Sequence, residues 1–474
     1  MHLTYDPAEG DAFWAKIRAI PGCPQEEPRL RRMLFEPGAL LRLPALLDEA
    51  GAAGRQVLAV ADPTPMRRGS DDLKPLVLGM LRAAGLDAAP LVLEPDATGQ
   101  VHTTMAQIEA LRARLSASAA VVAVGSGTVA DVAKHACHLF EQESGARVPL
   151  VFVQTANSVS AFTSNMAPVF LDGVKRTLPS RYPDALVCDL EILRDAPYAM
   201  TVAGVGDLLA AFVSFPDWYL AHRLGMDQSY SEFPQTLMGP LDDTFLAAAP
   251  AIRAQSLEGM AVLAKLIALA GLAMSLAHAT TPLSGFEHVI SHTLDLLAER
   301  AGRPLAQHGS QVAVATLAGA TAYEVFLDRF DPAAVDLAAC YPDPEAMRRR
   351  IERTFAAVDP SGRAGSECWA DYRLKLEAWH AHRDALAALL ADWAAARARL
   401  RELARPAARV ASILRAVGGP LSFGELEPPA SEADARFAFL SAPLMRRRLT
   451  IGDVLLFLGW DREALWAECL SAMT

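Results

Sequence analysis

The chain has 474 residues, of which 52% are hydrophobic and 21% are charged, and its formal net charge is −11. This composition is typical of a folded globular protein and excludes disorder over most of the chain, while the length predicts two or three domains. The negative charge repels phosphate backbones, so we expect no nucleic-acid partner.

The N-terminus and the cysteines indicate the cellular compartment. The first residues, MHLTYDPAEGD, are acidic and lack the apolar segment of a secretory signal. The six cysteines are scattered and form no CxxC pair, which is typical of reduced thiols. We therefore expect a cytoplasmic protein.

The first 195 residues alternate short apolar runs with amphipathic segments. The apolar runs predict strands at residues 56–61, 91–93, 119–124, 149–154 and 185–189. The amphipathic segments predict helices at residues 73–84, 103–115 and 129–140. This alternation favours an α/β fold with a parallel, doubly wound sheet. Asp172 and Gly173, between two apolar-leaning runs, predict a hairpin turn.

A glycine-containing turn lies between the strand at 119–124 and the following helix. Glycine at positions 125 and 127 would let the backbone approach a ligand closely, and the N–H groups at a helix start suit a phosphate. The run Gly125-Ser126-Gly127-Thr128 is not a GxGxxG fingerprint, however. Thr128 and Asp131 also fit a capping box, which would make Asp131 structural. This segment alone leaves a nucleotide-binding loop and an ordinary turn both open.

After about residue 195 the strand-like alternation disappears, and long helices rich in Ala, Leu and Arg continue to the end. We therefore expect an α/β domain over residues 1–195 and an all-helical domain over residues 196–474. The most apolar stretch, residues 260–279, is just long enough to span a bilayer. Because it contains Lys265 and many small residues, we interpret it as a buried core helix and expect no membrane span.

Acidic and imidazole side chains are the remaining candidates for binding a cofactor or a metal. Asp62 follows the first predicted strand, where an acid can bind ribose hydroxyls, although Asp-Pro-Thr-Pro is also turn chemistry. His288 and His292 are four residues apart, a spacing that can chelate a transition metal from one helix face. With His308 and Asp207 they form either a ligand set for zinc, nickel or iron, or a group of satisfied polar residues in a helical core.

Several short motifs occur together in the order of a known family. The ordered set resembles the glycerol-1-phosphate dehydrogenase family, within the superfamily of iron-type alcohol dehydrogenases, glycerol dehydrogenases and dehydroquinate synthases. The resemblance covers residues 35–458, with expected insertions at 230–253 and 330–367. It implies a dehydroquinate synthase-like fold, in which a Rossmann-like NAD(P)-binding domain precedes a helical metal and substrate domain. The motifs are GSGTVADVAKHA, TANSVSAFTS, LDGVK, PDALVCDLEILRDAP, AGVGDLLA, PLSGFEHVISH and QHGSQVAVAT.

The resemblance also implies site residues. Asp207, His288 and His308 would bind one divalent metal (zinc, nickel or iron), with His292 a neighbour outside the set. Ser160 and Lys175 are the expected catalytic residues, and Lys134 matches a second lysine motif near the cleft. The residues assigned to NAD or NADP are Asp62, Gly125, Ser126, Gly127, Thr128, Asp131, Thr155 and Ser158.

The implied activity is that of a metal-dependent, NAD(P)-linked oxidoreductase acting on a CH–OH group. Its substrate would be a small alcohol or ketone, either the pair sn-glycerol 1-phosphate and dihydroxyacetone phosphate or a related polyol. Two departures bear on that choice: Ser160 replaces a family acid, and Thr281 replaces a family arginine. Because a carboxylate and a cation are lost, we expect weak activity on dihydroxyacetone phosphate.

Two alternatives remain open. A lyase of the dehydroquinate synthase kind would use the same metal and NAD without net redox change. A non-catalytic descendant would bind nucleotide and turn nothing over. In each case we expect a homodimer or a larger homo-oligomer.

Overall fold

The computed structural model describes residues 3–26, 28–171 and 174–473. The chain divides into two compact units, and neither is a continuous stretch of sequence. The first unit comprises Met1–Leu208 and Glu232–Leu276, and the second comprises Leu209–Ser231 and Ala277–Thr474.

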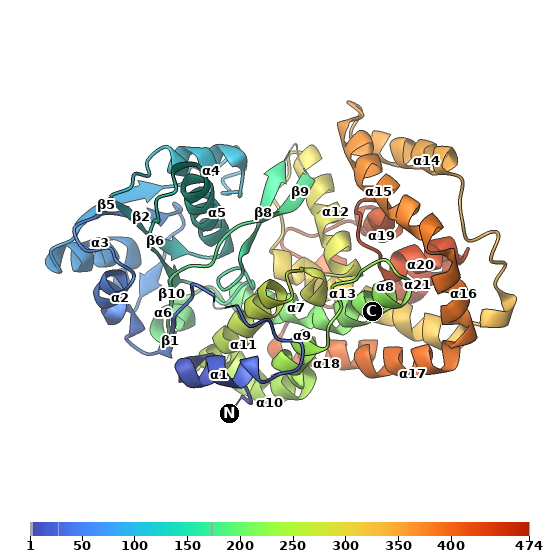
Figure 1. Cartoon of the computed structure of the whole chain (residues 1–474), viewed down its shortest axis with the longest axis horizontal. Coiled ribbons are helices and arrows are strands. Elements are labelled where there is room, and N and C mark those ends of the chain that lie inside the picture. The colour runs from blue at the N-terminus through green and yellow to red at the C-terminus, as the bar shows by residue number, and fades with distance from the viewer. Residues whose placement is uncertain (1–2, 27, 172–173, 474) are drawn as a thin grey trace. The chain divides into compact units, whose positions relative to one another are not determined.

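The first unit is built on a six-stranded sheet in which all neighbouring strands are parallel (Figure 1). The strand order is β1-β10-β7-β6-β2-β5. The strands are β1 (Arg32–Glu36), β2 (Gln56–Ala61), β5 (Asp87–Val92), β6 (Ala119–Gly125), β7 (Leu150–Gln154) and β10 (Ala185–Asp189). Strands β6, β7 and β10 are buried at every residue, as expected for strands covered on both faces.

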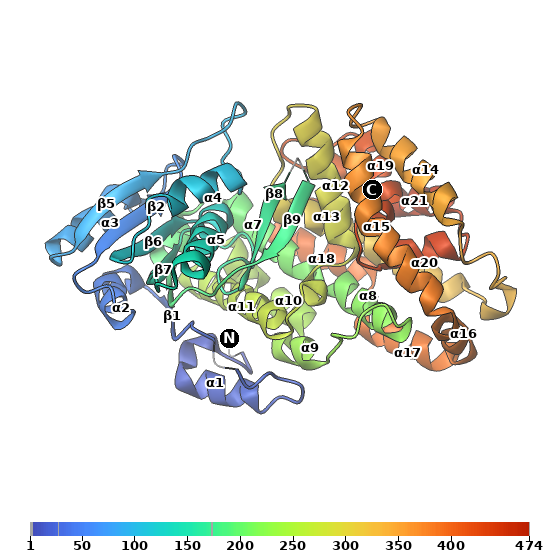
Figure 2. The same ribbon diagram turned by 45° about the horizontal axis from the view of Figure 1, so that its top comes forward.

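The connections of two neighbouring strands leave the sheet in opposite directions. Helix α3 (Leu73–Ala83) leads from β2 to β5, and helix α5 (Gly127–Ser144) leads from β6 to β7 on the other side. Because such crossovers are right-handed, α3 and α5 lie on opposite faces of the sheet (Figure 2). The carboxyl ends of β2 and β6 therefore flank the point where the strand order reverses, which is the usual ligand position in an open α/β sheet.

Helices cover both faces of the sheet. Helix α2 (Leu43–Glu49) shares the face of α3, and leucines of both helices form one apolar core with Val57, Val122 and Val187 of the sheet. Helix α4 (Met105–Arg112) packs against α5 on the other face. The helix–strand alternation predicted from the sequence is thus confirmed.

A hairpin and further helices complete the first unit. Strands β8 (Met166–Leu171) and β9 (Val174–Pro179) pair antiparallel, as the hairpin prediction requires, while Asp172 and Gly173 themselves lie outside the described residues. The short strands β3 (Arg67–Arg68) and β4 (Asp71–Asp72) form a separate ladder. The helices are α1 (Asp11–Arg18), α6 (Leu190–Asp195), α7 (Tyr198–Leu209), α9 (Phe233–Met238), α10 (Leu241–Arg253) and α11 (Leu257–Leu276).

The first unit extends beyond residue 195, where the sequence predicts a boundary. The reason is helix α11, which contacts β1 and α6 as well as α9 and α10. Asn157 fixes this packing, because its amide nitrogen donates to the Met260 carbonyl at 3.1 Å. Helices far along the chain therefore belong to the unit that contains the sheet.

The second unit consists of helices and short 3-10 turns over the residues that the structure describes. Its central helix α13 contacts α8, α12, α18 and α21. The helices are α8 (Ala211–Arg223), α12 (Phe286–Arg300), α13 (His308–Arg329), α14 (Pro344–Ala356), α15 (Arg363–Ala381), α16 (Arg383–Ala391), α17 (Trp393–Leu403), α18 (Ala407–Val417), α19 (Glu432–Ser441), α20 (Ile451–Phe457) and α21 (Arg462–Ala472).

Two helical stretches, Tyr198–Arg223 and Leu257–Leu276, are long and apolar enough to cross a membrane. In each of them 83% of the apolar window is buried inside the structure, which is what a core helix shows. The second stretch is the apolar segment that the sequence predicts to be a buried helix.

Two details of the sheet differ from the sequence prediction. Strand β5 spans Asp87–Val92, earlier than the run at 91–93, and it includes Pro90. Proline is tolerated there because β5 is an edge strand with one unpaired side. The sequence analysis does not predict strand β1, because its three apolar residues stand between two charged ones and make too short a run to indicate a strand.

Candidate metal and cofactor site

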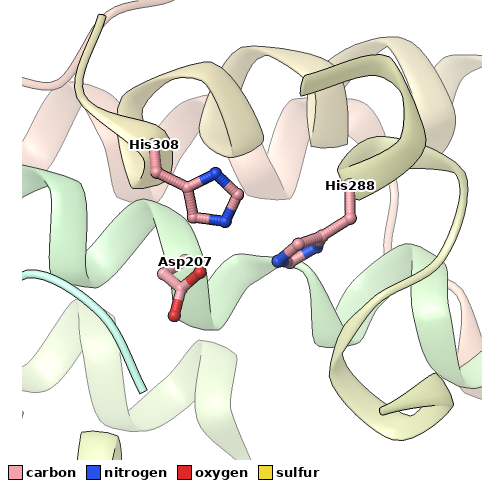
Figure 3. Close-up of side chains that lie close together, drawn as sticks. All are labelled: Asp207, His288 and His308. Atoms are coloured by element: carbon pink, nitrogen blue, oxygen red, sulfur yellow. The ribbon is translucent and has the colours of Figure 1, made fainter. Parts of the chain in front are cut away.

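Three side chains from three helices converge on one point (Figure 3). Asp207 lies near the end of α7, His288 lies in the first turn of α12, and His308 is the first residue of α13. Their ligand atoms, one carboxylate oxygen and two imidazole nitrogens, all lie within 4.8 Å of one another. The structure thus brings together the three residues that the resemblance implies as metal ligands.

The carboxylate of Asp207 is buried and oriented by the loop that follows β7. The backbone N–H and the hydroxyl of Ser160 both donate to its Oδ2 atom. Ser160 therefore touches a candidate ligand of the metal, which is a different contact from the substrate contact expected of a family acid at that position.

Glu287 orients His288. This glutamate is fully buried, and its Oε1 atom lies 2.9 Å from Nδ1 of His288 and accepts from the Gly285 N–H at 2.6 Å. A carboxylate on one imidazole nitrogen fixes the ring and leaves the other nitrogen for a metal. Its second oxygen, Oε2, is buried without a hydrogen-bond partner among the described residues.

A second buried carboxyl group, that of Asp217, interacts with the charge of Glu287. Burial, and next the charge of Glu287, raise the pKa of Asp217 to about 8, although three hydrogen bonds act in the opposite direction. The donors are the Tyr323 hydroxyl and the backbone N–H groups of Phe286 and Ile451. Asp217 therefore ties α8, α12, α13 and the start of α20 together around the helix that carries His288.

The other two imidazoles differ in their surroundings. Nδ1 of His308 lies 3.2 Å from the Ser291 hydroxyl, which leaves its other ring nitrogen toward the cluster. His292 stacks on His308 with ring centroids 5.7 Å apart, and its Nδ1 lies 3.1 Å from Nη2 of Arg446. His292 is not part of the group of converging ligand atoms, as the resemblance implies.

The donor set fits a divalent transition metal. One carboxylate oxygen and two imidazole nitrogens are ligands that zinc, nickel and iron(II) accept. Each of the three side chains has a hydrogen-bond partner that orients it, namely Ser160, Glu287 or Ser291. Three protein ligands also leave coordination positions open for a substrate oxygen.

The predicted cofactor loop lies at the carboxyl end of β6. Gly125 ends the strand, Ser126 is the N-cap of α5 without a side-chain capping bond, and Gly127 begins the helix. A Cβ atom at position 127 would lie 2.5 Å from Cγ2 of Val159, so the helix start packs directly on the loop after β7. Thr155 and Ser158 of that loop are buried beside it.

The capping box at Thr128 and Asp131 is not formed, because α5 begins one residue before Thr128. Asp131 instead pairs with the fully buried Lys134 at 2.8 Å, and Lys134 also donates to the Ala161 carbonyl at 3.0 Å. Burial raises the pKa of Asp131, while the charges of Lys134 and of Lys175 act in the opposite direction. Lys134 thus anchors α5 to the loop that carries Ser160.

The two remaining predicted residues lie on β9 and after β2. Nζ of Lys175 lies over the Phe170 ring, 5.5 Å from its centroid. Asp62 follows β2, and its Oδ1 accepts from the Thr64 N–H at 2.9 Å. One oxygen of Asp62 therefore stabilises the turn, as the sequence context predicts. Asp62 lies at the carboxyl end of β2, and β2 is the neighbour of β6 in the sheet.

Sequence reasoning missed the residues that support the cluster. Glu287 stands directly before His288, and a charged residue next to a metal-binding histidine was the one available signal. Asp217 and Tyr323 meet only in the folded chain, 106 positions apart, so no local pattern indicates them.

The chain is similar to known dehydrogenases. The family model described as iron-containing alcohol dehydrogenase matches residues 34–197. The chain is 30% identical to the glycerol-1-phosphate dehydrogenase [NAD(P)+] of Halobacterium salinarum over 298 residues, which is 60% of this chain and 79% of that protein. It is 31% identical to the enzyme of the same name from Bacillus velezensis, and that match spans 51% of this chain and 59% of the relative's length.

Solved structures show the same fold at lower identity. The glycerol dehydrogenase of Schizosaccharomyces pombe aligns with a TM-score of 0.57 at 15% identity, over 94% of this chain and 90% of that one. A probable glycerol dehydrogenase from Sinorhizobium meliloti aligns with a TM-score of 0.53 at 18% identity, over 94% and 98% of the two chains. These similarities confirm the α/β and helical architecture.

Proposed function

The chain belongs to the iron-containing alcohol dehydrogenase family, and on this premise we propose that it is a metal-dependent, NAD(P)-linked dehydrogenase that interconverts a small alcohol and its ketone. The observation that carries the proposal is the convergence of Asp207, His288 and His308. The relatives' names make sn-glycerol 1-phosphate and dihydroxyacetone phosphate the first substrate pair to test.

We assign the metal to Asp207, His288 and His308, and the nucleotide to the carboxyl ends of β2 and β6. A divalent ion supplies Lewis-acid polarisation of the substrate oxygen, and a nicotinamide carries the hydride. The remaining work falls to this chain's own residues. Ser160 holds the carboxylate of Asp207, and Glu287 holds His288 in one tautomer and one orientation.

The nucleotide assignment rests on topology and local structure. The Gly125–Thr128 turn starts helix α5, whose first N–H groups have no partner within the helix and suit a pyrophosphate. Asp62 lies at the neighbouring strand end and would face a ribose. Lys175, on strand β9, remains a predicted catalytic residue. Its charge acts to lower the pKa of Asp131 in helix α5.

Two measurements on the purified full-length protein test the proposal. Metal analysis should find one equivalent of a transition metal that is lost when His288 is replaced by alanine. Absorbance of the nicotinamide should change with turnover on a panel of phosphorylated and unphosphorylated polyols and ketones. Substrate conversion without net change in NADH would favour the lyase, and nucleotide-dependent stabilisation without turnover or metal would favour a non-catalytic protein.

A further inference from the structure

A fully buried tyrosine hydroxyl in the second unit has no hydrogen-bond partner. It belongs to Tyr372 of helix α15, and no residue that the structure describes donates to its oxygen or accepts from it. A buried hydroxyl of this kind is unfavourable unless a ligand or solvent completes it. The charged groups around Tyr372 indicate which ligand would do so.

Two arginines from other helices act on this hydroxyl. They are Arg350 of α14, a helix that packs against α15, and Arg462, the first residue of α21. Burial, and next the charge of Asp453, raise the pKa of Tyr372, whereas the charges of Arg350 and Arg462 act in the opposite direction. The two arginines also act on each other, because burial, and next the charge of Arg350, lower the pKa of Arg462 to about 10. Two cations and a phenol from three helices therefore share one region of the second unit.

Both guanidinium groups keep N–H groups that are available to a ligand. Nη1 of Arg462 donates to the Leu440 carbonyl at 2.6 Å, and its other N–H groups have no partner among the described residues. The side chain of Arg350 makes no hydrogen bond or ion pair within the same part of the chain. Both arginines are half-buried, so solvent reaches them. Guanidinium groups with unused donors are suited to an oxyanion.

The carboxylates near these cations are bound to other partners. Asp453 accepts from Nζ of Lys375 at 2.5 Å and, through its other oxygen, from the N-cap N–H of α20. Glu463, in the first turn of α21, pairs with Arg436. Lys375 itself adds a positive charge, because its Nζ lies 4.7 Å from the centroid of the Tyr372 ring. Positive groups therefore outnumber negative ones around the hydroxyl, which favours a bound anion.

We propose that Arg350, Tyr372 and Arg462 form a binding site for a small tetrahedral oxyanion such as phosphate or sulfate. The guanidinium groups supply charge-assisted N–H donors, and the phenol supplies a neutral third donor. A bound oxyanion joins helices α14, α15 and α21, because each helix contributes one donor group.

This site is separate from the proposed reaction and does not depend on it. None of its three residues belongs to the group of metal ligands or to the predicted cofactor loop. Because Arg350 lies in the insertion expected at residues 330–367, the family resemblance implies no such site. The oxyanion is therefore a stabilising ligand of the helical unit and not a substrate.

The test is a phosphate titration of the full-length protein by calorimetry at constant ionic strength. Arg350→Gln removes one cation, and Arg349→Gln is the matched control, because it removes the same charge from an exposed neighbour on α14. Tyr372→Phe removes only a hydroxyl that has no partner, so it should not lower the thermal midpoint measured without phosphate. Arg462 is left in place because it also binds the Leu440 carbonyl.

Phosphate should bind the wild-type protein and raise its thermal midpoint. Arg350→Gln should lower the phosphate affinity by about tenfold to a hundredfold, and Tyr372→Phe should lower it by several-fold, as expected for a charge-assisted and a neutral donor. Arg349→Gln should leave the affinity unchanged. Phosphate bound elsewhere, for example at the start of α5, would be insensitive to all three variants. The proposal is overturned if wild-type protein does not bind phosphate, if Arg350→Gln or Tyr372→Phe retains the wild-type affinity, or if Arg349→Gln weakens binding as much as Arg350→Gln.

Discussion

Ser160 donates two hydrogen bonds to a single oxygen of Asp207, one from its backbone N–H and one from its hydroxyl, each 3.0 Å long. These two bonds fix the rotation of the carboxylate group of Asp207 and so set the direction in which its second oxygen points. Ser160 acts on a candidate metal ligand, and a hydroxyl suits that role where a second carboxylate would repel Asp207.

Replacing Ser160 by alanine should weaken metal binding by about tenfold to a hundredfold, the usual effect of losing a hydrogen bond to a metal-binding side chain. The measurement is a competition titration with a chromogenic chelator. Ser160→Thr keeps the hydroxyl and should restore most of the affinity. Equal metal affinity in wild type and Ser160→Ala would contradict the positioning role.

Metal analysis of alanine variants should distinguish His288 and His308, which bind the metal, from His292, which does not. His288→Ala and His308→Ala should strip the metal and abolish turnover, because each removes one of the converging ligand atoms. His292→Ala should leave the metal content largely intact. The assignment is wrong if His292→Ala loses the metal while His308→Ala keeps it.

Asp62 should set the balance between the two nicotinamide nucleotides. A carboxylate near the adenosine ribose repels a 2′-phosphate, so wild-type protein should use NAD at least as well as NADP. Asp62→Ala should weaken NAD more than NADP, measured as the two KM values. Because Oδ1 of Asp62 also accepts from Thr64, Asp62→Asn is the variant that preserves the turn. A strong native preference for NADP would refute this role.

Gly127 should tolerate no side chain. The Cβ atom of Gly127→Ala would lie 2.5 Å from Cγ2 of Val159, and overpacking of this kind costs about 1–3 kcal/mol of stability. The displaced helix start should also weaken nucleotide binding. Gly79→Ala is the matched control, because no heavy atom lies within 4 Å of its Cβ and alanine favours the interior of α3. Chemical denaturation of both variants checks the prediction, and a Gly127→Ala protein as stable as wild type would contradict it.

His135 should make the protein sensitive to acid. Burial, with the charges of His138 and Lys134 acting in the same direction, lowers its pKa from 6.5 to about 4. Between these values the unfolded chain binds a proton that the folded chain does not, so stability falls as the pH falls from about 6.5 to about 4. His135→Gln should reduce the loss of thermal midpoint between about pH 7.5 and about pH 5. An unchanged loss would show that other groups dominate the acid response.

Much of the sheet followed from local sequence, because buried parallel strands are continuous apolar runs and their helices are periodic. The sequence predicts only the end of strand β5, because Asp87 and Pro90 interrupt the apolar pattern of this edge strand. The extension of the first unit to α11 depends on contacts between distant segments, such as Asn157 with Met260, which no local pattern carries.

The residues of the candidate site also divide into those that the sequence indicates and those that only the folded structure shows. The set of Asp207, His288 and His308 followed from the family motifs, because spacing alone pairs His288 with His292. Glu287 and Asp217 are visible only through their hydrogen bonds in the folded chain. Arg448 donates to Oγ1 of Thr280 from 168 positions later in the chain, and only tertiary structure joins the two.

The interleaved order of the two units constrains how the protein is made. A nascent chain emerging from the ribosome cannot close the first unit until residue 276 is available, because α9, α10 and α11 complete it. Asp207 is therefore synthesised well before its histidine partners, and long-range closure of this kind slows folding. Fragments cut at residue 195 should aggregate when expressed alone. A shortened chain in which residues 232–276 are fused directly to the end of residues 1–208 should instead yield a first unit that folds from one continuous sequence.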